Sequence, residues 1–89
     1  MTRIAITGAC GRMGRVIAGL VKERADCTII AGIDKLGERY DEFPVYTKVF
    51  DMPEKPDVII DFSHPSALPD LLSYGKMNNV PLVLATTGY

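Results

Sequence analysis

The sequence predicts an α/β fold, in which a parallel sheet is flanked by helices as in one half of a doubly wound architecture. Short apolar runs of strand length alternate with stretches in which apolar residues recur at helical spacing. A glycine-rich turn joins the first apolar run to the first helical stretch. Strands that alternate with helices pair in parallel through right-handed crossovers. No internal repeat or low-complexity segment interrupts this order.

The first third of the chain holds two predicted strands and one predicted helix. Residues 3–7 are nearly all apolar, which is typical of a strand buried on both faces. From Gly11 to about Arg24 the spacing changes to that of an amphipathic helix. The apolar residues that recur at this spacing are Met13, Val16, Ile17, Leu20 and Val21. Residues 27–33 form a second predicted strand, which Asp34 ends.

The rest of the chain continues this pattern. Residues 34–44 are polar and rich in turn formers, so we expect a surface loop there. A brief third strand is predicted at residues 45–46, with one or two helical turns before Pro53. Further strands are predicted at residues 58–62 and 81–85, and the last of these would form an edge of the sheet.

A helix is predicted between the last two strands, and its start is open between two positions. If Ser66 is the N-cap, Pro69 falls at the third helical position, where its missing N–H costs no intrahelical bond. If the helix begins at Pro65, Pro69 lies nearer the interior, which costs more. One helical face is shared by Leu68, Leu71, Leu72 and Gly75. Gly75 lowers helix propensity by about 1 kcal/mol, so we expect it to allow close packing on the sheet.

Composition excludes several functional classes. The chain has 89 residues and 47% hydrophobic content, enough for one small domain with a modest core. Its net charge of −1 provides no basic surface for nucleic acid. No apolar run approaches the roughly 20 residues that span a bilayer, and no secretory signal pattern opens the chain. We therefore expect a cytoplasmic protein that binds neither nucleic acid nor membrane.

The cysteines and the histidine indicate no metal site. Cys10 and Cys27 are too few for a disulfide framework or a zinc site, so we expect both thiols to be reduced. Cys10 lies near a helix N-terminus and a cation, surroundings typical of a reactive thiol, but the chain offers it no base. We interpret Cys10 as a small residue that fills the loop.

Three glycines in the segment "IAITGACGRMG" (residues 4–14) predict a binding site for a dinucleotide. Gly8 would end the strand in a tight turn, Gly11 would let a pyrophosphate approach the backbone, and Gly14 would let the helix pack on the strand. The helix N-terminus would offer free N–H groups and about half a positive charge to the anion. The setting between a strand and an amphipathic helix favours a Rossmann-like site over a tight turn that binds nothing.

An acidic residue at the end of the second strand supports this interpretation. Asp34 lies 20 residues beyond Gly14, where it could accept hydrogen bonds from an adenosine ribose. The alternative is a turn-forming aspartate. Either Arg12 or Lys35 could pair with a 2′-phosphate, which a carboxylate alone would repel. We therefore predict that both NADH and NADPH are used, although Lys35 could also be a solvated surface charge.

Three segments together resemble a known family. "GACGRMG" at 8–14, "DVIIDFSHP" at 57–65 and "LATTGY" at 84–89 are similar to the N-terminal part of dihydrodipicolinate reductase (4-hydroxy-tetrahydrodipicolinate reductase). They occur in the family's order and extend through essentially the whole chain. The resemblance implies an NAD(P)H-dependent oxidoreductase of lysine and diaminopimelate biosynthesis. Residues 1–89 would be the N-terminal NAD(P)-binding domain of a longer protein, without its substrate domain.

The resemblance also implies contacts with the cofactor. Asp34 would contact the adenosine ribose, and Lys35 the 2′-phosphate. Phe62 and Ser63 would border the cofactor after the fourth strand. The segment Ala85, Thr86 and Thr87 matches the family's Gly-Thr-Thr beside the nicotinamide, with Ala85 in place of the glycine. The pyrophosphate would be held by Gly8, Ala9, Cys10, Gly11, Arg12 and Met13.

No catalytic residue is assigned in this chain. His64 has no evident charge partner, and the family's proton donor belongs to a His-His…Lys segment of the substrate domain. We therefore expect the small-molecule substrate to bind only the full-length protein, and residues 1–89 alone to be inactive. An exposed edge at residues 82–85 also predicts a homo-oligomer. Two alternatives remain open: a different amino-acid dehydrogenase, such as aspartate or homoserine dehydrogenase, and a non-catalytic module that senses a nucleotide or CoA.

Overall fold

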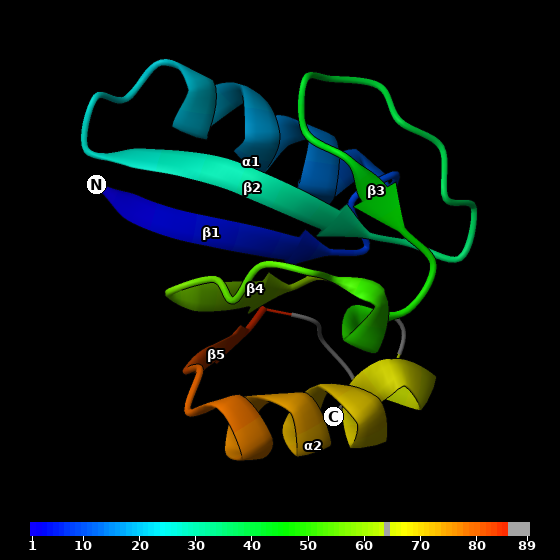
Figure 1. Ribbon diagram of the computed structural model, residues 1–89. Helices are drawn as coiled ribbons and strands as arrows, with labels where there is room; N and C mark the ends of the chain where they lie inside the picture. The colour runs from blue at the N-terminus through cyan, green and yellow to red at the C-terminus, as the bar shows by residue number, and fades with distance from the viewer. Residues whose placement is uncertain (64, 86–89) are drawn as a thin grey trace.

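The computed structural model describes residues 1–63 and 65–85 as one parallel sheet with helices on both faces (Figure 1). The strands are β1 (Thr2–Thr7), β2 (Cys27–Ile33), β3 (Val45–Tyr46), β4 (Val58–Asp61) and β5 (Leu82–Leu84). The helices are α1 (Arg12–Lys22) and α2 (Leu68–Asn78), with 3₁₀ turns η1 (Val49–Asp51) and η2 (Pro65–Ala67). The five strands lie in the order β3-β2-β1-β4-β5, and every neighbouring pair is parallel. The predicted α/β fold is confirmed.

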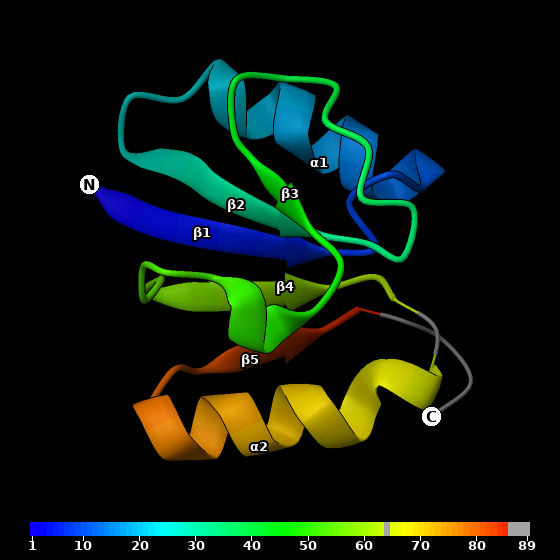
Figure 2. The ribbon, with the colours of Figure 1, turned by 45° about the vertical axis from the view of Figure 1, so that its right-hand side comes forward.

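The two helices cover opposite faces of the sheet (Figure 2). Successive residues of β1 point to opposite faces, so this central strand contributes to two core clusters. The cluster beneath α1 includes Ile4, Ile6, Ala18 and Val21. The cluster beneath α2 includes Ala5, Ile59, Leu71 and Tyr74. Burial on both faces explains why the central strands are almost entirely apolar.

The register places three strand ends side by side. Thr7, the last residue of β1, pairs with Ile33 of β2 on one side and with Asp61 of β4 on the other. The chain moves outward from β1 to β3 and then returns to β4 on the other side of β1. The strand order therefore reverses between β1 and β4, which is where open α/β sheets form a crevice for ligands.

The bounds of the strands and loops agree closely with the sequence prediction. β2 and β3 have the predicted bounds, β1 and β4 differ from them by one residue at one end, and β5 is shorter by one residue at each end. Residues 34–44 hold no helix or strand, as predicted for a loop. One residue of that loop, Phe43, is nevertheless buried against the cluster beneath α1.

The helix α1 corrects two details of the prediction. It ends at Lys22 rather than near Arg24, and Gly11 is its N-cap rather than a helical residue. The buried residues of α1 are Gly14, Ala18 and Val21. In contrast, the predicted apolar face is largely outside the core, because Met13, Val16 and Leu20 are each about half exposed. The close approach of Gly14 and Ala18 leaves these three side chains on the flank of the helix, whereas Val21 is buried as predicted and Ile17 packs against the cluster beneath α1.

The start of α2 lies between the two predicted alternatives. Helical structure begins at Pro65 as a 3₁₀ turn, but the α-helix begins at Leu68 with Ala67 as its N-cap. Pro69 therefore occupies the first turn, where it breaks no helical hydrogen bond. Of the predicted shared face, Leu71 and Gly75 are buried and Leu72 is half exposed, while Tyr74 is buried next to Gly75. Gly75 does allow close packing, since a Cβ there would lie 2.9 Å from the carbonyl oxygen of Val80.

Two further findings concern the described residues. No helix in this part of the chain combines the length and hydropathy needed to cross a membrane. No three metal-ligating side chains among residues 1–63 and 65–85 are grouped to hold an ion.

Candidate nucleotide-binding site

A crevice of about 670 Å³ lies at the carboxyl ends of the strands, where the strand order reverses. Its walls come from the residues at the ends of β1, β2, β3 and β4, from η2 and from the first turn of α2. Six of the residues predicted to contact the cofactor line it: Gly8, Gly11, Asp34, Lys35, Phe62 and Ser63. The fold thus brings together residues that are up to 55 positions apart in the sequence.

Each glycine of the turn meets a different steric requirement. Gly8 has a φ of +69°, and a Cβ on it would lie 2.6 Å from the carbonyl oxygen of Phe62. A Cβ on Gly14 would lie 2.5 Å from the carbonyl oxygen of Gly8, so α1 packs directly on the turn. A Cβ on Gly11 would meet only that same oxygen, at 3.3 Å, beside the crevice. Glycine is therefore required for steric reasons at positions 8 and 14, whereas at Gly11 the missing side chain leaves the backbone accessible to a ligand.

The N-terminus of α1 opens beside this turn. Gly11 caps the helix without a side chain, so no side-chain oxygen occupies the first-turn N–H groups. Arg12 and Met13 are exposed and do not line the crevice with their side chains. Their backbone N–H groups are the donors that a helix N-terminus presents to an anion.

Asp34 connects the glycine turn to the end of β2. One carboxylate oxygen accepts a hydrogen bond from the Cys10 N–H at 2.9 Å, and the other accepts one from the Leu36 N–H at 3.0 Å. The bond from Leu36 is the turn-forming role that the sequence left open. Each carboxylate oxygen can accept a further bond, so the turn and a contact with ribose are compatible.

The loop after β2 packs against the glycine turn from outside. The Cys10 thiol donates to the carbonyl oxygen of Glu38 at 3.3 Å, and both cysteines are free thiols. Arg15 donates to the carbonyl oxygen of Cys10 at 3.0 Å, and its guanidinium lies 4.2 Å above the ring centre of Tyr40. Burial raises the pKa of Tyr40. These contacts support the interpretation of Cys10 as a residue that fills and ties the loop.

Asp61 is a buried residue of the site that sequence reasoning missed. Its side chain is fully buried at the end of β4, and its Oδ1 accepts hydrogen bonds from the hydroxyls of Thr7 and Ser63 and from the Ser63 N–H. The Phe62 N–H donates to the Thr7 carbonyl oxygen at 3.1 Å. The available signal was a charged residue within the apolar run "VIIDF", at a position that pairs with Thr7.

The remaining predicted residues lie around the crevice or outside the described range. Ala9 is fully buried beneath the turn. Ala85 follows β5, is exposed, and donates its N–H to the Asp61 carbonyl oxygen at 3.0 Å. Thr86, Thr87 and His64 lie outside the described residues. Among residues that were not predicted, Thr47, Lys48, Ser66 and Asp70 also line the crevice.

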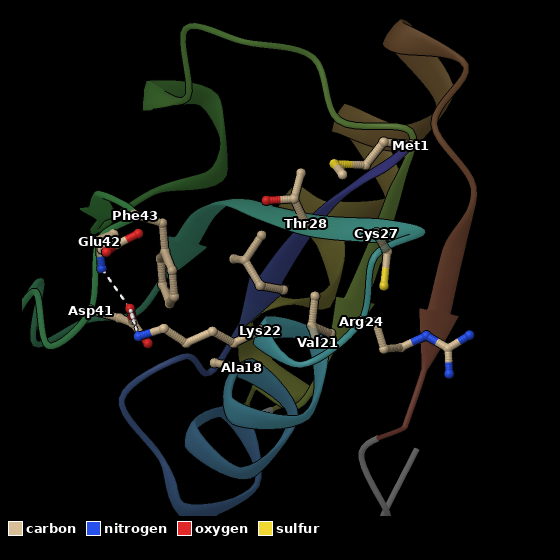
Figure 3. Close-up of a pocket in the computed structure, with 11 residues that line it drawn as sticks. Met1, Ala18, Val21, Lys22, Arg24, Cys27, Thr28, Asp41, Glu42 and Phe43 are labelled. Carbon is tan, nitrogen blue, oxygen red and sulfur yellow. Dashed lines mark hydrogen bonds and ion pairs between the residues drawn. The ribbon is translucent and has the colours of Figure 1, made fainter.

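A second, smaller cavity of about 260 Å³ lies at the other end of α1 (Figure 3). It is formed by the last turns of α1, the start of β2 and residues 41–43. Figure 3 shows the ion pair between Lys22 and Asp41 at its side, with a distance of 3.2 Å. None of the predicted site residues lines this cavity. The crevice at the carboxyl ends is therefore the candidate site.

The fold and the crevice define the class of protein. A parallel sheet whose order reverses beside a glycine turn, with an acidic residue at the end of β2, is a Rossmann-like α/β domain.

Comparison with known proteins identifies the family within this class. Residues 2–89 match the family described as dihydrodipicolinate reductase, N-terminus. The chain is 42% identical over 89 residues to the 4-hydroxy-tetrahydrodipicolinate reductase of Clostridium novyi and 43% identical over 89 residues to that of Clostridium tetani. In each case the match covers all of this chain and 35% of the relative. The chain belongs to the dihydrodipicolinate reductase family and corresponds to its N-terminal part.

A solved structure agrees with this assignment. Dipicolinate-bound dihydrodipicolinate reductase from Paenisporosarcina sp. TG-14 superimposes with a TM-score of 0.81 and 25% sequence identity. The match covers all of this chain and 39% of that protein. The chain thus spans about a third of the length of its curated relatives. The family resemblance of the three motifs is confirmed, which disfavours aspartate or homoserine dehydrogenase and an independent sensing module.

Proposed function

We propose that this chain binds a reduced nicotinamide dinucleotide as the N-terminal part of a 4-hydroxy-tetrahydrodipicolinate reductase of lysine and diaminopimelate biosynthesis. The observation that carries the proposal is the open backbone at Gly11, which lines the crevice at the N-terminus of α1. A pyrophosphate fits such a place, because it needs N–H donors and close approach to the backbone. The dinucleotide would supply the hydride, and this chain would supply its binding site.

Each end of the crevice is proposed to hold one part of the dinucleotide. The backbone of residues 8–13 would hold the pyrophosphate. Asp34 would accept hydrogen bonds from the adenosine ribose while keeping its bonds to Cys10 and Leu36. Phe62 would border the nicotinamide side, because it follows β4 on the other side of the turn. Ala85, Thr86 and Thr87, which follow β5 in the sequence, complete the proposed set.

The reaction itself is proposed to need more than these residues. Hydride transfer requires a substrate held against the nicotinamide and a positioned proton donor. No residue of this chain is proposed as that donor, His64 included. The small-molecule substrate would bind in the remainder of the full-length protein, which we propose to be a cytoplasmic homo-oligomer. Reductase activity from residues 1–89 alone would contradict the proposal that the proton donor and the substrate site lie outside these residues.

The adenosine end of the crevice supports use of both NADH and NADPH. Lys35 is exposed, lines the crevice and follows Asp34 directly. The Asp34 carboxylate would serve a ribose hydroxyl, as NADH presents. The Lys35 ammonium would offset the repulsion between this carboxylate and the 2′-phosphate of NADPH.

Calorimetric titration of the complete polypeptide with NADH and NADPH tests the proposal. We expect both nucleotides to bind, and Lys35→Ala to weaken NADPH several-fold with little effect on NADH. Lys55→Ala is the matched control, because Lys55 is an exposed lysine outside the crevice. If neither nucleotide binds, the proposed function is wrong. If both bind and Lys35→Ala leaves their affinity ratio unchanged, only the role of Lys35 is wrong.

A further inference from the structure

The crevice has a wall that comes from the end of β3. Thr47 and Lys48 line it together with Asp34 and Lys35. β3 pairs in parallel with β2, and the Asp34 N–H donates to the carbonyl oxygen of Tyr46 at 2.9 Å. The residues that follow β3 therefore lie beside the residues that follow β2, at the end of the crevice proposed for the adenosine ribose.

The backbone of Lys48 is held in place from both sides. On one side, β3 ends at Tyr46, two residues before Lys48. On the other side, Val49 is only 4% exposed and belongs to the core cluster beneath α2. The turn after β2 also abuts this segment, since a Cβ on Gly37 would lie 3.0 Å from the Thr47 Cγ2. Lys48 is exposed, as is Thr47 before it. The Lys48 side chain therefore starts from a fixed backbone position on the crevice wall.

The charges at this end favour an anion. The Asp34 carboxylate already accepts two backbone hydrogen bonds, which partly offset its charge. Within residues 1–63 and 65–85, neither Lys35 nor Lys48 forms an ion pair. The crevice is therefore lined at this end by two lysines and the hydrogen-bonded Asp34, while the second carboxylate that lines it, Asp70, comes from the first turn of α2. A phosphomonoester carries between one and two negative charges near neutral pH, and lysines bind it as point charges.

We propose that Lys48 is a specificity-determining residue that binds the 2′-phosphate of NADPH together with Lys35. This inference rests on the proposed function, because it assigns the adenosine ribose to Asp34. Two cations on adjoining strand ends can hold the phosphate from two directions, while NADH has no group there for them to bind. Lys48 therefore raises the affinity for NADPH without lowering that for NADH.

The test compares two pairs of ligands on the complete polypeptide. Dissociation constants are measured for NADPH and NADH, and for adenosine 2′,5′-bisphosphate and adenosine 5′-monophosphate. We expect Lys48→Ala to weaken NADPH and the bisphosphate about tenfold and to leave the other two within about twofold. Lys48→Arg keeps the charge and should retain most of the affinity. Added salt should reduce the loss, because it screens an exposed charge pair.

Exposed lysines outside the crevice provide matched controls. Lys55→Ala and Lys76→Ala remove the same charge elsewhere and should leave all four constants unchanged. The inference is overturned if Lys48→Ala matches these controls. It is also overturned if Lys48→Ala weakens all four ligands equally, since that result indicates a structural effect. Failure of the unaltered protein to bind either dinucleotide would instead overturn the proposed function.

Discussion

At the scale of single residues, the buried carboxylate of Asp61 connects the two sides of the crevice. Thr7, which donates to it, immediately precedes the glycine turn, and Ser63, which also donates to it, follows Phe62. A buried charge is tolerated only where hydrogen bonds replace its lost hydration. The bonds that stabilise Asp61 therefore also fix the distance between the turn after β1 and the loop after β4.

Replacing Asp61 should destabilise the protein strongly. In Asp61→Ala, the buried Thr7 hydroxyl and the part-buried Ser63 N–H lose the Asp61 oxygen as an acceptor, and a buried donor left unsatisfied costs about 1–3 kcal/mol. We expect the free energy of unfolding to fall by about 2–4 kcal/mol, measured by urea denaturation.

Asp57→Ala is the control for this change. Asp57 is exposed and accepts a hydrogen bond from the Arg3 N–H at the other end of the sheet. Water can replace that bond, so the loss should be much smaller than for Asp61→Ala. Equal losses in the two variants would refute the role given to Asp61.

The two aspartates of the site show what sequence can reveal. Asp34 was predictable because its distance from the glycine turn is a local property of the strand–helix–strand unit. Asp61 was not, because its role depends on its pairing with Thr7, 54 positions earlier. A lone charge at the end of an apolar run looks the same in sequence whether it is exposed or, as here, fully buried.

At the scale of elements, helix α1 shows why periodicity identifies a helix better than its buried face. Five apolar residues predicted one face, namely Met13, Val16, Ile17, Leu20 and Val21. Met13, Val16 and Leu20 are about half exposed, whereas Val21 is buried together with the small residues Gly14 and Ala18. Small residues contribute little to a hydropathy pattern but decide how near a helix can approach. The prediction for Gly14 was confirmed because it used a steric argument rather than hydropathy.

Two glycines of α1 allow this packing to be tested within one helix. In Gly14→Ala, the new Cβ would lie 2.5 Å from the Gly8 carbonyl oxygen and 2.8 Å from the Ala9 Cα, so backbone must move. We expect a loss of about 1–3 kcal/mol in the free energy of unfolding.

Gly19→Ala is the matched substitution, because a Cβ there would have no neighbour within 4 Å. Alanine stabilises the interior of an exposed helix by about 1 kcal/mol relative to glycine. Urea denaturation should therefore move the two variants in opposite directions. The packing argument fails if Gly14→Ala is as stable as Gly19→Ala.

At the scale of the whole molecule, β5 forms one edge of the sheet. Val83 is 51% exposed and Leu84 is 45% exposed. Among the described residues, no strand pairs with the outer side of β5. An apolar edge with unpaired backbone groups tends to pair with another chain. Its place at the edge was predictable from the order of elements.

This edge predicts that the 89-residue chain associates with itself through β5. Light scattering over a range of concentrations should show an average mass that rises above that of a monomer. Val83→Lys places a charge on the exposed edge and should shift the chain toward the monomer. Leu36→Lys is the control, since Leu36 is 67% exposed in the loop after β2 and away from β5. If the unaltered chain stays monomeric at high concentration, or if both lysine variants associate equally, then β5 does not drive the association and any oligomer of the full-length protein must use another surface.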